Sequence, residues 1–397
     1  MSNAKDIFKN HQAQTFPFPS CLEIASAKGS YITDISGKKY LDFVAGVSAN
    51  TLGHSNPIIT NAAKKQLEKY SHVMVYGEYI QSPQYKLAQL LAENLPEKLS
   101  TTYFTNSGTE AIEGAMKLAK RATGRPEIIS CKDSYHGSTQ GALSIMGNEI
   151  NKTNYRPLLP DCNQIIYNDI NSLKNITKET AAVIIETIQG ASGFITPQNN
   201  FLQKVKKQCK KVGALLVFDE IQTCYGRLGT LFGFEKYDVI PDILCIAKGM
   251  GAGMPIGAFI SSWELMNLLT LNPKLGHITT FGGHPVNCAA SLSCLEYLLN
   301  SQIMNKVNHK QQLFLKHLKH PKIKAVRGNG LMLAIEFNDE TLVQKVVEES
   351  LENGLILFYF LFTKTAIRIT PPLTISEEEI VKGCKIIIEI LNKHNSK

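Results

Sequence analysis

Three uninterrupted apolar segments, each followed at once by a charged residue, constrain the fold of this 397-residue chain more than any other feature. The segments are 181–185, 215–218 and 243–247, and the charged residues are Glu186, Asp219 and Lys248. Residues 201–212 lie between the first two segments, place apolar side chains at helical spacing and are followed by a glycine. Continuous apolar strands that alternate with helices are typical of a mostly parallel sheet covered on both faces. The sequence therefore predicts an α/β fold.

A fourth polar group follows another predicted strand. Residues 101–105 favour a strand, and the helix after it opens on Ser107-Gly108-Thr109-Glu110, a capping-box pattern, and stops at Gly124. In open parallel sheets, ligands bind beyond the carboxyl ends of the strands. We therefore expect this helix start to meet Glu186, Asp219 and Lys248 at one site.

The last hundred residues show a different pattern. Alternating residues at 325–337, a helical spacing at 342–351, a short strand at 366–369 and a capped helix from Ser376 predict a smaller α+β domain. Short strands at 31–33 and 39–44 are expected to pack with it. The predicted organisation has three parts: an N-terminal segment packing with the small domain (1–55), a large domain (56–295) and the C-terminal small domain (296–397).

Composition excludes several classes of protein. With 44% apolar and 19% charged residues, the chain is not disordered as a whole. The net charge of +8 is mild, and the most basic stretch, 306–327, has neither zinc-finger spacing nor interleaved aromatics, so no nucleic-acid partner is expected. The longest apolar run, 355–362, is too short to span a bilayer. Nine cysteines without C-x-x-C, and a polar start without a signal sequence, predict a cytoplasmic protein with no membrane partner.

Each group at a strand end can be explained either by a purely structural role or by a role in binding or catalysis. Ser107-Gly108-Thr109 fits a plain helix cap or a phosphate site, because amides at a helix start favour anions. Asp219 fits a solvated strand end, or a carboxylate that holds a cationic ring nitrogen or a metal. Lys248 fits a surface turn, or a desolvated amine that is nucleophilic toward carbonyls. The glycines after Lys248 lack the order of a dinucleotide fingerprint.

Together these groups match the needs of pyridoxal phosphate. That cofactor requires a lysine for its aldehyde, an acid for its ring nitrogen, an anion cradle and an aromatic residue to stack on the ring. Tyr135, beside His136-Gly137, could supply the aromatic face, or could equally be ordinary core. No metal is expected in such a site.

The motifs identify the chain as similar to the class III (ω-type) aminotransferases of pyridoxal-phosphate fold type I, over about residues 22–388. The most specific matches are Leu215-Leu-Val-Phe-Asp-Glu-Ile-Gln-Thr, Gly226-Arg-Leu-Gly and Ala247-Lys-Gly-Met-Gly-Ala-Gly-Met-Pro-Ile-Gly257. Ser107-Gly-Thr-Glu-Ala, Tyr135-His-Gly and Thr280-Phe-Gly-Gly also match. The resemblance implies a large sheet domain and a small domain built from both ends of the chain.

The resemblance also implies roles for single residues. Lys248 resembles the lysine that binds the cofactor covalently and shuttles the proton, and Asp219 the acid at the ring nitrogen. Around the cofactor, the implied contacts are Gln222 at the ring hydroxyl, Gly108 and Thr109 at the phosphate, Tyr135 on the ring, and Thr280 at the phosphate of the neighbouring subunit. The implied substrate-binding residues are Arg368, which grips the α-carboxylate, with Ser138 and Thr279.

Within the family, the sequence most resembles acetylornithine and ornithine aminotransferases. Two positions depart from that pattern. Those relatives have a glutamate after Gln-Gly that pairs with the α-carboxylate arginine, and here that position is Ala191. They also have an arginine after His-Gly that holds the distal carboxylate of the substrate, and here it is Ser138. The amino donor is therefore left open.

The resemblance predicts a homodimeric aminotransferase that moves an amino group from an amino acid or amine to a 2-oxo acid, with 2-oxoglutarate/glutamate or pyruvate as the partner couple. A decarboxylase or aminomutase of the same fold is the nearest alternative. An inactive, aminotransferase-like binding module and a nicotinamide oxidoreductase are more distant ones.

Overall fold

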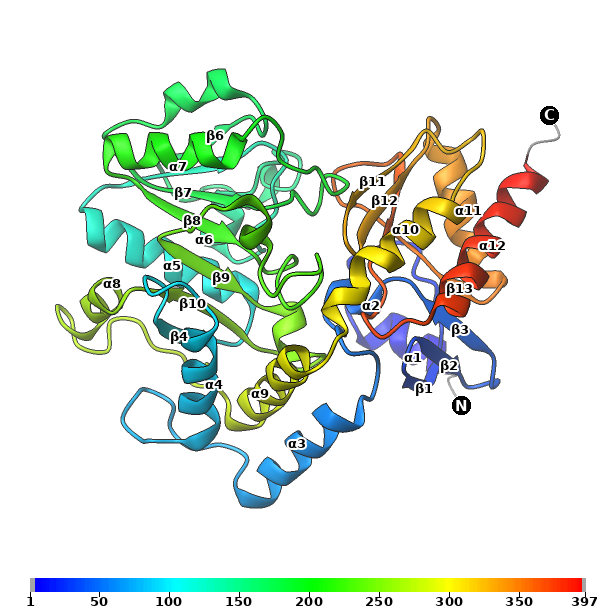
Figure 1. Ribbon diagram of the computed structural model, residues 1–397, viewed down its shortest axis with the longest axis horizontal. Coiled ribbons are helices and arrows are strands. Elements are labelled where there is room, and N and C mark those ends of the chain that lie inside the picture. Colours follow the sequence, from blue (N-terminus) through cyan, green and yellow to red (C-terminus); the bar gives the residue numbers. More distant parts are fainter. Residues whose placement is uncertain (1–3, 395–397) are drawn as a thin grey trace.

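The computed structural model describes residues 4–394, which form two lobes side by side (Figure 1). The larger lobe is built on a seven-stranded sheet. Its strands, in spatial order, are β4 (Thr101–Thr105), β10 (Gly257–Ser261), β9 (Ile243–Ile246), β8 (Leu215–Asp219), β7 (Thr180–Glu186), β5 (Glu127–Cys131) and β6 (Cys162–Ile165). All neighbours are parallel except those of β10, which runs antiparallel to β4 and β9. The predicted α/β fold with a mostly parallel sheet is confirmed.

Helices cover both faces of this sheet. One face packs against α5 (Gly108–Thr123) and α8 (Trp263–Asn267) through an apolar cluster that includes Ile112, Val217 and Phe259. The other face packs against α4 (Ser82–Glu93), α7 (Phe201–Val212) and α9 (Pro285–Asn300). Successive residues of a strand point to opposite faces, so strands buried on both faces must be apolar throughout. This explains the uninterrupted apolar segments of the sequence.

The smaller lobe joins the two ends of the chain. Its antiparallel sheet runs in the order β11 (Ala325–Asn329), β12 (Met332–Glu336), β15 (Ala366–Ile369) and β14 (Phe358–Tyr359), and its helices are α10 (Val307–His317), α11 (Glu340–Glu352) and α12 (Glu377–Lys393). A second sheet runs β1 (Ile24–Lys28), β2 (Tyr31–Asp34), β3 (Lys39–Asp42) and β13 (Leu355–Ile356). Because β13 pairs in parallel with β3, the first strands of the chain are bonded to its last hundred residues.

Helix α9 crosses the expected boundary at residue 296. It packs on α4 and on α3 (Pro57–Lys69) in the large lobe, and the chain continues from its end toward α10 in the small lobe (Figure 1). The other expected boundary, at residue 55, immediately precedes Asn56, whose side chain caps α3.

Local signals in the sequence explain where the helices begin and end. Helix α7 spans the predicted residues 201–212 and stops at Gly213, whose φ of 76° lies in the left-handed region. Ser376 and Glu379 form both hydrogen bonds of the capping box that begins α12. At α5 the prediction was half wrong: Ser107 caps the helix, but the Glu110 carboxylate accepts from the amide of Asn106 instead of Ser107.

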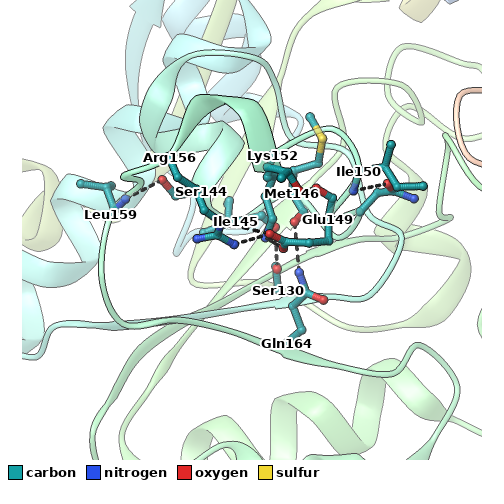
Figure 2. Close-up of polar contacts among 12 residues, drawn as sticks. Ser130, Ser144, Ile145, Met146, Glu149, Ile150, Lys152, Arg156, Leu159 and Gln164 are labelled. Atoms are coloured by element: carbon teal, nitrogen blue, oxygen red, sulfur yellow. Dashed lines mark hydrogen bonds and ion pairs between the residues drawn. The ribbon is translucent and has the colours of Figure 1, made fainter.

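The long loop after α6 (Gln140–Ser144) is tied to the sheet by side chains (Figure 2). Ser130 on β5 donates to the carbonyl of Ile145 at 2.6 Å, and Gln164 on β6 donates to the carbonyl of Met146 at 3.0 Å. Farther along, Glu149 pairs with both Lys152 and Arg156. These contacts fix the segment that follows Tyr135-His136-Gly137. None of the helices within residues 4–394 is long and apolar enough to cross a membrane.

We predict that Gly383→Val in α12 lowers the free energy of unfolding by about 1–3 kcal/mol, because overpacking displaces the core around it. A Cβ atom at Gly383 would lie 2.1 Å from the Phe43 ring, where the start of the chain packs on its last helix. Denaturant unfolding of Gly383→Val and of the exposed control Lys385→Val on the same helix measures this. Equal stability of the two variants would contradict the packing argument.

Candidate active site

A cleft of about 2530 Å³ opens at the carboxyl ends of the large-sheet strands and extends along the small lobe. It brings together nearly all the residues singled out from the sequence. The lining residues include Ser107, Gly108, Thr109, Tyr135, Ser138, Glu186, Ala191, Asp219, Gln222, Lys248 and Arg368. Strands β7 and β8 are in register, so that Glu186 and Asp219 are directly paired at the edge of the sheet. As predicted, Glu186, Asp219, Lys248 and the start of α5 meet in one cleft.

Lys248 follows β9 after one residue and begins the short 3₁₀ helix Lys248–Gly251. Its φ of 46° is left-handed, a conformation that a non-glycine residue adopts at a cost in free energy. Burial lowers the pKa of its amine, and the positive charge of Arg368 acts in the same direction, while Asp219 opposes them. A lysine with a lowered pKa is more often neutral and can attack a carbonyl carbon.

Asp219, at the end of β8, is held by a buried histidine. Its Oδ2 atom lies 2.7 Å from Nδ1 of His136, and its Oδ1 atom accepts from the amide of Ile221 at 3.0 Å. Burial opposes charging of His136, but the hydrogen bond and the charge of Asp219 raise the pKa of the imidazole above its ordinary value. The two hydrogen bonds fix the direction of the carboxylate. Sequence reasoning named His136 only as a neighbour of Tyr135, and its pairing is visible only in the fold.

Glu186 is a second buried carboxylate in the cleft. It accepts from the amide of Tyr135 at 3.1 Å and from the amide of Gly190 at 2.8 Å. Burial raises its pKa to about 7, with the charge of Asp219 acting in the same direction and His136 opposing it. Glu186 thus links two segments that line the cleft, 135–138 and 190–191.

The start of α5 fits a phosphate. The amides of Gly108 and Thr109 lie in the first turn, where they have no acceptor within the helix and where the helix dipole favours an anion. Side chains leave no room for a larger residue: a Cβ atom at Gly108 would lie 2.6 Å from Ile221, and one at Gly137 would lie 2.1 Å from Thr109 Oγ1. Packing against Ile221 and Thr109 therefore favours glycine at both positions.

Tyr135 and Gln222 lie on the walls of the cleft. The Tyr135 hydroxyl is 3.2 Å from Ser138 Oγ, so the aromatic side chain and the serine form one polar contact at the mouth. Gln222 donates to Ser48 at 3.2 Å. Its Oε1 atom would be 2.5 Å from a Cβ atom at Gly190, so a larger residue there would displace the end of the glutamine side chain.

Arg368 enters the cleft from β15 of the small lobe. Its Nε atom donates to the carbonyl of Tyr359 at 3.2 Å, and its guanidinium lies over the ring of Phe360 at 5.0 Å. Among residues 4–394, no carboxylate comes within ion-pairing distance of it. Burial lowers its pKa to about 10, which still leaves it charged at neutral pH. A buried cation without a carboxylate is a site for a ligand anion.

Thr279 and Thr280 do not line this cleft. Thr279 accepts a hydrogen bond from Asn106 at 2.9 Å, and Thr280 is exposed on the loop that leads to α9. The described part of the chain also contains no cluster of three His, Cys, Asp or Glu residues that could hold a metal. Glu220, next to Asp219 in the sequence, does not belong to such a cluster. Its carboxylate accepts hydrogen bonds from the amides of Gly233 and Phe234.

Comparison with known proteins places this site in a family. Residues 13–391 match the family model "Aminotransferase class-III". Acetylornithine aminotransferases of Methanopyrus kandleri and Bacillus subtilis are 35% and 37% identical, with 98% and 94% of this chain and 99% and 96% of those proteins covered. The solved ornithine aminotransferase of Toxoplasma gondii has a TM-score of 0.92 at 28% identity, covering 100% of this chain and 97% of that one.

Fold and site together define a pyridoxal-phosphate-dependent transaminase of fold type I. The chain belongs to the class III aminotransferases. A related amine transaminase from a Pseudomonas species has been solved with this cofactor bound, at 25% identity and a TM-score of 0.86 over 96% of this chain and 99% of that one. The side chains present here fit the cofactor: a lysine of lowered pKa, a histidine-backed carboxylate and a helix start lined by glycine all face one cleft.

We predict a pH-dependent effect of Glu186→Gln on stability. The raised pKa means that folded protein keeps a proton that the unfolded chain releases above its ordinary value of 4.5. The free energy of unfolding of the parent minus that of the variant should therefore fall by roughly 2–3 kcal/mol as pH rises from about 5 to 8. The buried Glu220, whose pKa is raised to about 8, lowers the stability of both proteins over this range and cancels in the difference. Denaturant unfolding of the cofactor-free proteins at both pH values measures it, with the exposed Glu97→Gln as control. A parent-minus-variant difference that is constant with pH would refute the assignment.

Proposed function

We propose that this aminotransferase takes an α-amino acid as donor, holds its α-carboxylate on Arg368 and returns the amino group to a 2-oxo acid. The observation behind this proposal is that Arg368 is buried in the same cleft as Lys248 and has no carboxylate partner among the described residues. A planar guanidinium binds a carboxylate through two parallel hydrogen bonds. A substrate held in this way is placed by its charge, and its amino group is free to react.

The remaining side chains act on the cofactor or on protons. When bound, pyridoxal phosphate supplies an electron sink for the substrate's α-carbon. We assign to Lys248 the covalent attachment, and to its Nζ atom the transfer of the proton between the substrate and the cofactor. Asp219, oriented by His136, holds the proton on the ring nitrogen. Gly108 and Thr109 would bind the phosphate, Tyr135 would cover the ring and Gln222 would contact the ring hydroxyl.

The active unit in this proposal is a homodimer. Thr280 is exposed and does not line the cleft of its own chain, which supports a role for it at the phosphate of the neighbouring subunit. Its loop also exposes Ile278 and Phe281, apolar side chains that a partner would cover. Thr279 is held by Asn106 and would position this loop.

N-acetylornithine is the second candidate donor, because the similar curated proteins are acetylornithine aminotransferases. That substrate reacts at its far amino group and leaves its carboxylate distant from the reacting nitrogen. In such relatives an arginine after His-Gly receives this carboxylate, whereas Ser138 offers no charge. The glutamate that would pair with Arg368 during that half-reaction is also absent, because the position is Ala191. The charges of this cleft therefore favour an α-carboxylate at Arg368.

We predict that Lys248→Ala abolishes transamination and covalent retention of pyridoxal phosphate, because Lys248 is the buried lysine among the described residues that line the cleft. Borohydride reduction followed by peptide mass spectrometry shows the attachment site directly, and absorbance shows bound cofactor. Lys364→Ala, an exposed lysine of the same cleft, serves as the control for attachment. Near-parental turnover of Lys248→Ala without added amines would refute the assignment.

The donor preference is a separate prediction. The second-order rate constant kcat/KM for N-acetylornithine and 4-aminobutyrate should lie roughly 10- to 150-fold below that for glutamate or another α-amino acid. This range corresponds to the loss of one charge-assisted hydrogen bond, about 1.5–3 kcal/mol. Arg368→Ala should remove the advantage of the α-amino acid. The proposal fails if N-acetylornithine or 4-aminobutyrate is the best donor by tenfold or more.

A further inference from the structure

The wall of the cleft beside Arg368 is made of apolar side chains that are open to solvent. Strand β14 pairs with β15 so that Phe358 stands directly opposite Arg368, and cross-strand partners share one face of a sheet. Phe358 is 53% exposed, and Leu361, on the same segment, is 52% exposed. Both line the cleft. Ala334, the other cross-strand partner of Arg368, is fully buried in an apolar cluster with Phe360.

The N-terminal segment adds a second apolar surface to the same cleft. Phe16 and Phe18 line it and contact each other edge to face, with ring centroids 6.1 Å apart. Phe18 is 79% exposed. Exposed apolar side chains scattered singly are ordinary, but several around one ligand cleft indicate contact with an apolar group.

The charged residues that line the cleft also indicate an apolar ligand group. Among the described residues that line it, the lysines and arginines are Lys248, Lys364 and Arg368. Lys248 is the proposed reacting group, and Lys364 is 85% exposed and lies 3.7 Å from Glu340. His136 is buried against Asp219. After Arg368 has bound one carboxylate, the described residues that line the cleft offer no other buried, unassigned lysine or arginine for a second one, and burying a carboxylate without a partner is costly.

We propose that the cleft beside Arg368 is an apolar subsite that selects monocarboxylic α-amino acids with large apolar side chains, together with their 2-oxo acids, over dicarboxylic substrates. The inference rests on the proposed function. Arg368 binds the α-carboxylate, and the side chain of the substrate lies against Phe358 and Leu361. A glutamate or 2-oxoglutarate side chain would place its second carboxylate on this apolar wall.

The test is a half-reaction with holoenzyme and one donor at a time: leucine, phenylalanine, alanine or glutamate. Conversion of bound cofactor from its aldehyde to its amine form is followed by absorbance, and the second-order rate constants are compared. Leucine or phenylalanine should exceed glutamate by about tenfold or more, since pockets built for apolar groups discriminate on this scale. In the reverse half-reaction, the 2-oxo acid of leucine should exceed 2-oxoglutarate.

Two variants test the wall itself. Phe358→Ala and Leu361→Ala should each lower the leucine-to-alanine ratio of rate constants severalfold, whereas Trp263→Ala should leave it unchanged. Trp263 is 60% exposed on α8 and lies outside the cleft lining. Glutamate reacting as fast as leucine, or a ratio unaffected in both wall variants, would overturn the subsite. If no α-amino acid converts the cofactor at all, the proposed function itself is wrong. That result is distinct from conversion without a preference for apolar donors, which would contradict the subsite alone.

Discussion

The parallel register of β7, β8 and β9 is the constraint on which the rest of the site depends. Because these strands run the same way and pair residue by residue, Glu186 and Asp219 end at one edge of the sheet and Lys248 follows one residue beyond β9. The hydrogen bonds of the sheet set the spacing of Glu186 and Asp219, and loop residues that include His136 and Tyr135 orient the two carboxylates. The strands are buried on both faces, so the edge is rigid. A chemistry that needs an amine and an acid at a set separation is well served by such an edge.

Charges buried at this edge are balanced locally and in different ways. Asp219 is paired with His136, Glu186 is held by two backbone amides and has a raised pKa, and the amine of Lys248 has a lowered one. Arg368 is the exception, since an aromatic ring and a carbonyl are the partners its side chain has. Burying charge is costly unless it is compensated. Among the described residues, the groups assigned to the cofactor thus have their charges compensated by the protein, whereas Arg368 has no carboxylate partner.

The two lobes contribute different groups of residues to the site. The large sheet presents the residues assigned to the cofactor, and the small lobe presents Arg368 together with the apolar segment that follows β13. Because β13 pairs with β3, the N-terminal segment is joined to the same lobe that bears Arg368. Substrate preference can therefore change in the small lobe without disturbing the strand ends. Ala191 and Ser138, by contrast, lie in the large lobe, in loops that follow β7 and β5.

The sequence by itself determined the parallel sheet, the helix limits at Gly213 and Ser376, and the strand-end positions of Asp219 and Lys248. Each of these follows from local signals: uninterrupted apolar strands, left-handed glycines and caps that act within one turn. Only the tertiary structure decided the pairing of His136 with Asp219, residues 83 positions apart, and the antiparallel insertion of β10. It also decided that Arg368 lacks a carboxylate and faces Phe358. Such contacts join distant segments across packed elements, and no local pattern encodes which side chains will meet there.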